Sequence, residues 1–259
     1  MLSERRQKVL NALVDEYVIT ASPVGSRTLA QRYLTGVSAA TIRNELSRLE
    51  TEGYAASPHT SAGRVPTNGG YRLFVNAILL QNIGLTSAMT AAVEPLPRRL
   101  GMVGAEDLHP LDGFDTEESL KALSDSTGQM AVLWIRYPER IIRRQGLSQL
   151  LSQPEFRDAA TVIPLLRLLE TPAALTLLLE DCLRTNNFVV QIGIEDDNNR
   201  LSAFSLVAER IHREPLDGVI ALFGPTRMDY RRAIDAIGMA AEIISQRGVQ
   251  EARRDLFGN

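Results

Sequence analysis

The stretch SAATIRNELSRLET, at residues 38–51, decides the fold of the first part of the chain. Ile42, Leu46 and Leu49 recur at helical spacing, so they form one apolar stripe along a helix. The serine that opens the stretch is a typical N-cap residue, and a glycine stands two positions beyond its end, as it often does after a helix. We therefore predict a helix over these residues.

The opposite side of this predicted helix is small, polar and basic. Glu45 and Glu50 fall nearer the buried edge, so the outward side has almost no acidic side chain. Small residues let a helix enter a major groove, while Asn and Arg can bond adenine and guanine at two points. A DNA recognition helix requires these features, although a solvated helix face is the alternative. The residues expected to face DNA are Ala40, Thr41, Arg43, Asn44 and Arg48.

Two shorter helical patterns precede this helix. Residues 3–19 carry apolar side chains at helical spacing, which predicts a first helix ending near Ala21. A second, short helix is predicted to end at Tyr33, with Ser26 as its N-cap. Three short helices with a tight turn before the last one give the outline of a helix-turn-helix.

Residues 54–67, YAASPHTSAGRVPT, indicate two short strands joined by a tip of small residues. A β-hairpin directly after a recognition helix is a wing, so residues 1–80 are predicted to form a winged-helix DNA-binding domain. Donors at the tip can reach phosphates or a minor groove, although a plain surface loop is the alternative. A further helix is predicted to follow, capped by Thr67 or Asn68. The remaining residues expected at the DNA are Arg27, Ser38, His59, Thr60, Ser61 and Arg64.

The net charge of −3 conceals an uneven distribution. Residues 1–75 carry nine basic and six acidic side chains, whereas residues 76–259 carry nineteen and twenty-five. A basic first part fits a nucleic-acid-binding module attached to a different body. One cysteine, Cys182, excludes an intrachain disulfide, and no uncharged apolar run approaches the ~18 residues of a membrane span. With no apolar signal segment at the start, the sequence predicts a cytoplasmic protein without a membrane partner.

The rest of the chain is predicted to hold a linker, residues 81–114, and a second domain, residues 115–259. The linker loses periodicity and contains several prolines and glycines. Beyond it, strands mix with helices, and turn-length gaps separate the last three strands, which indicates an α+β domain with an antiparallel sheet. Helices are predicted at residues 116–126, 154–183 (broken near Pro172) and 227–247. Strands are predicted at residues 129–136, 141–147, 188–194, 202–211 and 218–223.

Five stretches of the chain resemble the heat-inducible transcription repressor family HrcA. They are PVGSRTL at 23–29, SAATIRNEL at 38–46, PHTSAGRVPT at 58–67, LSQPEFRD at 151–158 and GPTRMDY at 224–230. The resemblance implies a winged-helix head and a body similar to a GAF domain, into which a dimerising segment is inserted. It also implies a homodimer that binds double-stranded DNA at an inverted-repeat operator before chaperone operons. Heat would release this repressor, and the chaperonin would help it to return to the active form.

The chain departs from this family pattern at one place. Between Arg136 and Gly146, where the resemblance places two strands around a long insertion, the chain has only nine residues. The inserted dimerising segment is therefore expected to be absent. The dimer is then expected to use other surfaces, or the regulation to differ.

No pattern for catalysis or metal binding stands out. His59, His109 and His212 are scattered, and the acidic Glu195–Asp197 cluster is more typical of a turn. The Gly224–Thr226 turn lacks phosphate-loop spacing and is predicted to cap the final helix. The resemblance implies no catalysis and no obligatory cofactor, so neither an enzyme nor a metal site is predicted. The alternatives are a regulator whose GAF-like domain binds a small effector, an enzyme with an accessory winged helix, and a winged helix that binds protein.

Overall fold

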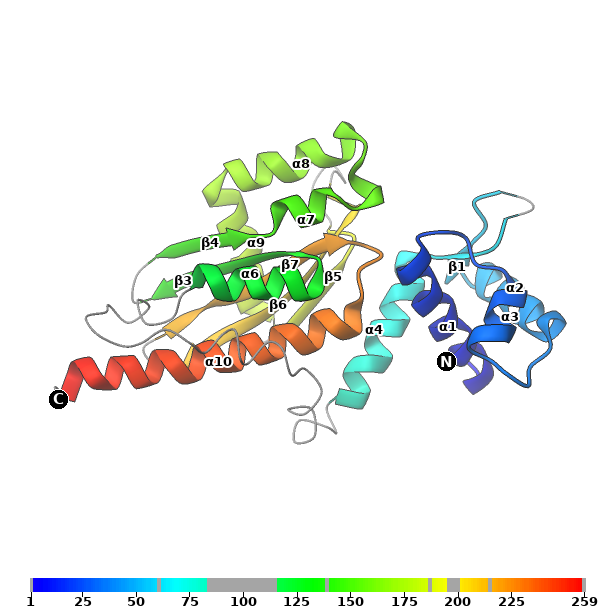
Figure 1. Cartoon of the computed structure of the whole chain (residues 1–259), viewed down its shortest axis with the longest axis horizontal. Helices are drawn as coiled ribbons and strands as arrows, with labels where there is room; N and C mark the ends of the chain where they lie inside the picture. Colours follow the sequence, from blue (N-terminus) through cyan, green and yellow to red (C-terminus); the bar gives the residue numbers. More distant parts are fainter. Residues whose placement is uncertain are drawn as a thin grey trace. The chain divides into compact units, whose positions relative to one another are not determined.

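The chain combines helices with antiparallel sheets, as predicted for an α+β protein (Figure 1). The computed structural model describes residues 2–59, 62–82, 116–137, 140–185, 188–194, 201–213 and 216–257. It divides into two units, Met1–Thr86 and Ser87–Asn259. Nearly all of the predicted linker at 81–114, together with His109 and Glu195–Asp197, lies outside the described residues.

Three helices, a hairpin and a fourth helix form the N-terminal unit. Ile42 and Leu49 are fully buried and Leu46 nearly so, because the predicted apolar stripe packs against the two preceding helices. The order of elements is α1 (Glu4–Thr20), α2 (Ser26–Arg32), α3 (Ala39–Thr51), β1 (Ala55–Ala56), β2 (Val65–Pro66) and α4 (Asn68–Asn82).

In the N-terminal unit the helix ends follow the predicted capping pattern with one exception. Oγ of Ser38 accepts a hydrogen bond from the Thr41 amide at 3.1 Å, and Oγ1 of Thr67 accepts one from the Gly70 amide at 3.2 Å. The prediction that Ser26 caps α2 was wrong, because that helix begins one residue earlier than expected. Gly25 is its N-cap, and Ser26 is a buried first-turn residue.

One five-stranded antiparallel sheet forms the centre of the second unit. Its strands are β3 (Met130–Tyr137), β4 (Ile141–Gln145), β5 (Phe188–Ile192), β6 (Phe204–Arg213) and β7 (Leu216–Pro225), in the order β4-β3-β7-β6-β5. The last three strands are neighbours, as predicted. Every residue of β7 is buried, because this central strand has a partner on each side and helices over both faces.

Helices cover the two faces of this sheet (Figure 1). On one face, Leu133 and Ile220 meet Leu123 and Ile244 of α6 (Thr116–Thr127) and α10 (Tyr230–Phe257). The other face packs against α7 (Leu147–Leu151), η2 (Pro154–Phe156), α8 (Ala159–Glu170) and α9 (Pro172–Thr185). Within the described residues no single helix has both the length and the apolarity to cross a membrane; α8 and the start of α9 reach those limits only as a pair bent by 90°.

Two local predictions for this unit need correction. The strand predicted at 141–147 ends at Gln145, because Gly146 has a φ of +89° and a Cβ there would lie 1.7 Å from Oγ of Ser124. The Gly224–Thr226 turn does not cap the last helix. That helix begins at Tyr230, and Oδ1 of Asp229 accepts the Arg232 amide at 3.1 Å.

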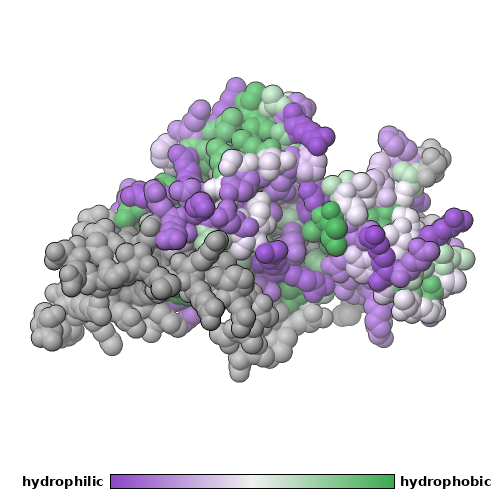
Figure 2. Space-filling model, in the orientation of Figure 1, coloured by the Kyte–Doolittle hydropathy of each residue, from purple (hydrophilic) through white to green (hydrophobic). Residues whose placement is uncertain are grey.

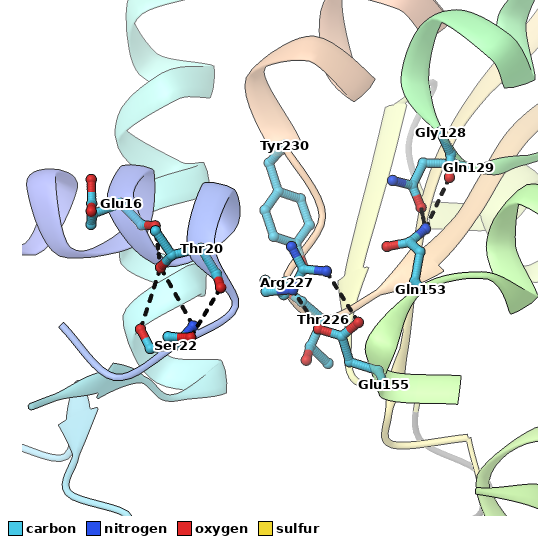
Figure 3. Close-up of polar contacts among 10 residues, drawn as sticks. All are labelled: Glu16, Thr20, Ser22, Gly128, Gln129, Gln153, Glu155, Thr226, Arg227 and Tyr230. Carbon is cyan, nitrogen blue, oxygen red and sulfur yellow. Dashed lines mark hydrogen bonds and ion pairs between the residues drawn. The ribbon is translucent and has the colours of Figure 1, made fainter. Parts of the chain in front are cut away.

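The two stretches of this unit that resemble HrcA, residues 151–158 and 224–230, meet in space. Glu155 forms an ion pair with Arg227, as Figure 3 shows. Beside it, the ring of Phe156 stacks on Phe204 with centroids 4.7 Å apart. These residues hold η2 against the turn that leads into α10, so their role in the structure is to join two distant parts of the fold.

Glu209 of β6 is a largely buried carboxyl group beneath α10. Burial, with a contribution from nearby Glu242, raises the pKa of Glu209 to about 7. A Cβ at Gly238 of α10 would lie 3.5 Å from Oε2 of Glu209. Because this pKa lies above the ordinary value of 4.5, the folded state binds the proton more tightly than the unfolded chain. The contribution of Glu209 to stability is therefore full below about pH 4.5 and is lost as the pH rises through about 7.

We predict that Glu209→Gln removes the loss of stability that deprotonation of Glu209 causes as the pH rises. The variant should gain stability over the parent between about pH 5 and about pH 8, by at most about 3 kcal/mol. Chemical unfolding of both proteins at several pH values measures the difference. Burial also raises the pKa of Asp235. Because Asp235 is present in both proteins, its effect on stability largely cancels in the difference between them. A stability difference that stays constant with pH would show that Glu209 is not the titrating group.

Candidate nucleic-acid interface

One side of α3 presents the predicted recognition residues together. Thr41 is half-buried beside Ser38, and their hydroxyl oxygens lie 2.9 Å apart. The opposite side of the helix holds its apolar stripe in the core, which fixes the rotation of the helix about its axis. The exposed residues of α3 and its cap are Ser38, Ala40, Arg43, Asn44, Ser47, Arg48 and Thr51.

The acidic side chains of α3 are tied back to arginines from other segments. Glu45 is only 7% exposed, and its Oε2 accepts a hydrogen bond from Nε of Arg6 at 3.1 Å. Glu50 pairs with Arg64 at 2.8 Å, and Glu52, just beyond the helix, pairs with Arg6. These pairs compensate the acids with arginines from other segments, and Arg48 of the exposed side approaches Glu45 only at 3.8 Å. That side therefore keeps its positive charge.

The basic residues around α3 are exposed. Arg48 is 64% exposed, and its closest carboxylate oxygen, on Glu45, is 3.8 Å away. Arg43 and Arg27, the latter on α2, are also exposed, and neither has an ion pair among the described residues. An uncompensated, exposed guanidinium can bind a phosphate or a base edge without first breaking an internal pair.

An ion pair between buried Glu16 and exposed Arg32 joins α1 to α2. Glu16 is 4% exposed and accepts two hydrogen bonds from Arg32, the shorter at 2.8 Å, and one from the Tyr33 hydroxyl at 3.0 Å. Burial and this carboxylate raise the pKa of Tyr33. A second set of contacts, between Thr20 and Ser22 at the end of α1, shapes the turn toward α2 (Figure 3).

The loop between β1 and β2 carries the other predicted contacts. His59 is exposed, whereas Thr60 and Ser61 lie outside the described residues. Arg64 is only 22% exposed, because its Nε donates to Glu50 of α3 at 3.0 Å and a terminal nitrogen donates to the Ala62 carbonyl at 3.4 Å. The geometry thus gives Arg64 a bracing contact between the loop and α3, which the sequence did not reveal.

A backbone pairing between Val24 and Arg64 also escaped sequence analysis. Each amide donates to the other residue's carbonyl at 2.9 Å, so the segment before α2 lies beside the hairpin like a third strand. Gly63 permits this approach, since a Cβ there would lie 2.4 Å from the Val24 carbonyl carbon. The sequence contains this glycine, but nothing in it identifies the distant partner.

The described residues contain no group of three or more His, Cys, Asp or Glu side chains placed to hold a metal ion.

Known proteins resemble this chain across both units. The HrcA protein C terminal domain matches residues 115–234. A heat-inducible transcription repressor HrcA of Parafrankia sp. is 43% identical over 144 residues, which span 53% of this chain and 37% of that protein. The HrcA of Frankia casuarinae is 29% identical over 336 residues, which span 95% of this chain and 98% of that protein.

The chain is therefore similar to HrcA proteins over nearly its entire length. Its length differs from that of its relatives. The alignment with the Frankia HrcA extends over 336 positions, whereas the aligned 95% of this 259-residue chain is only about 246 residues. The alignment is therefore about 90 positions longer than the aligned part of this chain. The direct β3–β4 connection, in which Ile135 pairs with Ile141, is the place where the sequence predicts the missing segment.

A solved crystal structure supports the fold. It is described as that of a hypothetical protein, is 18% identical to this chain, and matches it with a TM-score of 0.76 over 97% of this chain and 100% of that one. At this identity the likeness concerns the fold alone. It extends over both units of this chain.

We predict that Gly63→Ala disturbs the N-terminal unit, whereas Gly25→Ala does not. A Cβ at Gly63 would overlap the Val24 backbone, while one at Gly25 would have no atom within 4 Å. The Gly63 variant should lose about 1–3 kcal/mol of stability through the broken pairing, and the Gly25 variant less than about 1. Thermal unfolding and amide exchange at Val24 measure both. Equal losses of stability in the two variants would contradict the close approach of Gly63 to the Val24 backbone.

Proposed function

We propose that this protein is a heat-controlled transcription repressor whose N-terminal unit is a winged-helix DNA-binding domain. Its similarity to HrcA proteins supports this, since those curated relatives are named heat-inducible transcription repressors. The observation that carries the proposal is the charge arrangement of α3. Its acids pair with Arg6 and Arg64, while its exposed side offers amide, hydroxyl and guanidinium donors.

In this proposal α3 enters a major groove. Asn44 and Arg48 read base edges, and the small Ala40 with half-buried Thr41 allows close approach. The buried stripe on the far side of the helix supports this rotation, because it directs both readout side chains outward.

Phosphate contacts would flank the recognition helix. Arg27 and Arg43 are exposed on two different helices, and the first turn of α3 behind Ser38 presents backbone amides. The β1–β2 loop acts as the wing, with His59, Thr60 and Ser61 as its contact residues. Val24 and Glu50 hold the base of this wing in place.

Two copies of the winged helix would read the two halves of an inverted-repeat operator before chaperone genes. In the proposal the body, residues 115–259, is a GAF-like module that regulates and pairs the chains without catalysis or an obligatory cofactor. Heat releases DNA by weakening the dimer or the body, because an oligomer loses binding steeply as it dissociates. The chaperonin then assists recovery of the active form.

We predict that Asn44→Ala and Arg48→Ala each weaken operator binding by about 1–3 kcal/mol and relax sequence preference, because each removes a base contact. Gel shifts with an inverted-repeat duplex and a scrambled duplex measure both effects. Lys121→Ala is the matched control, since it removes an exposed charge from the other unit. If Arg48→Ala binds the operator as the parent does, the assigned rotation of α3 in the groove is wrong.

A second prediction separates phosphate binding from bracing by Arg64. If Arg64 binds a phosphate, Arg64→Ala weakens all duplexes alike and lowers the salt slope by about one ion, while Glu50→Ala does not reproduce the loss. If Arg64 acts as a brace to Glu50, both substitutions weaken binding similarly and leave the slope unchanged. We expect the brace, measured by binding at four salt concentrations or more. Arg43→Ala provides the comparison for a direct phosphate contact.

A ligand-responsive regulator is the second candidate function. An open groove of about 510 Å³ lies at the end of β4, the start of α7 and the end of α8. Arg144, Ser148 and Glu170 supply polar groups, and Leu166 and Leu169 supply apolar surface. Such a groove can hold a small effector. Thermal unfolding in the presence of candidate metabolites tests this, with Ser148→Trp as the variant that fills the groove.

A further inference from the structure

Three basic side chains surround one carboxylate at an end of the body's sheet. Asp217, near the start of β7, accepts hydrogen bonds from Nε and Nη2 of Arg210 at 3.1 and 2.9 Å and forms an ion pair with Arg136. Nδ1 of His212 lies 3.3 Å from the same carboxylate oxygen as Arg210 does. The side chain of Asp217 is only 11% exposed. Its charge is therefore compensated from both neighbouring strands, β3 and β6.

The basic side chains carry more charge than this carboxylate compensates. Arg136 is half-exposed and reaches Asp217 with Nη2 alone, while Arg210 uses Nε and Nη2. The imidazole of His212 is mostly exposed and uses Nδ1. Among the described residues, Nη1 of both arginines and Nε2 of the histidine have no hydrogen-bond partner. These groups can donate hydrogen bonds to a bound anion.

Arg140, one position before β4, adds a positive charge at the same end of the sheet. Because Ile135 pairs with Ile141, Arg136 and Arg140 come next on the two adjacent chains. Ile142 packs against the core under α7 to α9, and Arg140, two positions earlier, belongs to the same face. Arg140 is exposed and has no ion pair among the described residues. Figure 2 shows hydrophilic surface along β4, next to the hydrophobic surface over α8.

These basic groups form a row across adjacent strands. The strand order β4-β3-β7-β6 places Arg140, Arg136 and His212 along about 14 Å, since neighbouring strands lie about 4.8 Å apart. One phosphate or carboxylate is too short to contact the whole row, whereas several linked phosphates can. Guanidinium groups bind phosphate oxygens at two points. Because residues 76–259 carry more acidic than basic side chains, this positive row is not a general property of the body.

We propose that this basic row, formed by Arg136, Arg140, Arg210 and His212, binds an oligophosphate anion. The anion is either a free phosphate chain or the phosphate chain of a nucleotide. Asp217 holds the row from the inside, and the outward donors bind phosphate oxygens. A ligand that binds only the folded state stabilises it. Under the proposed function, and only there, bound oligophosphate would raise the temperature at which the repressor leaves DNA.

The first test is isothermal titration calorimetry of the full chain with inorganic triphosphate. The parent should bind with a Kd of about 100 µM or less, and orthophosphate should bind at least about 10-fold more weakly. ATP distinguishes the sources: tighter binding than triphosphate assigns the site to nucleotides, and weaker binding assigns it to free phosphate chains. Orthophosphate binding as tight as that of triphosphate, or a triphosphate Kd above about 1 mM, overturns the proposal.

Two arginines of the same hairpin provide a matched pair of variants. Arg143 is exposed like Arg140 and also has no ion pair among the described residues, but it pairs with Leu133, which faces α6 and α10. Arg140→Gln should weaken triphosphate binding about 5-fold or more, and Arg143→Gln less than about 2-fold. Neither change breaks an internal ion pair, so thermal unfolding without ligand should match the parent. Equal weakening by both changes contradicts the assigned site.

A second comparison separates charge from structure at Arg136. Arg136→Gln should weaken triphosphate binding about 10-fold, and Arg136→Lys, which keeps the charge, should recover part of the loss. Equal weakening by the two substitutions would mean that Arg136 only supports the sheet.

Operator binding without oligophosphate distinguishes this inference from the proposed function. Arg140→Gln should bind the operator duplex as the parent does, because the substitution lies in the other unit from α3. If the parent binds triphosphate but prefers no operator, only the proposed function fails. If operator binding is intact and triphosphate does not bind, only the oligophosphate site fails.

Discussion

The body of this protein depends on covering both faces of one antiparallel sheet. Its central strand, β7, is buried along its entire length. β7, the last strand in the chain, forms hydrogen bonds with β3, the first strand of the unit, on one side and with β6 on the other. A sheet with two apolar faces must be covered twice, which requires α6 and α10 on one side and α7 to α9 on the other. The Glu155–Arg227 contact then holds one covering layer to the start of α10.

The N-terminal unit combines a firmly held α3 with a positively charged exposed side, and the proposed contact with DNA requires both. Ion pairs from α3 run inward, from Glu45 to Arg6 and from Glu50 to Arg64. They stabilise the helix position with residues that do not occupy the exposed side. The same arginine that reaches Glu50 has its backbone paired with Val24, so the hairpin, α2 and α3 are fixed relative to one another.

Sequence periodicity predicted most elements, since burial of apolar residues imposes the spacing of helices and strands. The stripe of Ile42, Leu46 and Leu49 therefore gave the correct rotation of α3. Long-range pairings were beyond sequence analysis. Nothing local shows that Val24 meets Arg64, or that β7 lies beside β3. Two helix starts were misplaced: Gly25, not Ser26, is the N-cap of α2, and Asp229, which accepts the Arg232 amide locally, lies closer to the start of α10 than the Gly224–Thr226 turn.

The hairpin between β3 and β4 has a consequence for how proteins with this fold can vary in length. Among the described residues β4 is an edge strand paired only with β3, and the register from Ala131–Gln145 to Ile135–Ile141 is set by the strands themselves. Adding chain between them costs mainly loop-closure entropy, which grows by only about 0.6 kcal/mol for each doubling of loop length. A whole domain can thus be gained or lost at this point during evolution while the sheet keeps its register. The same hairpin is a suitable place to insert a reporter domain by design.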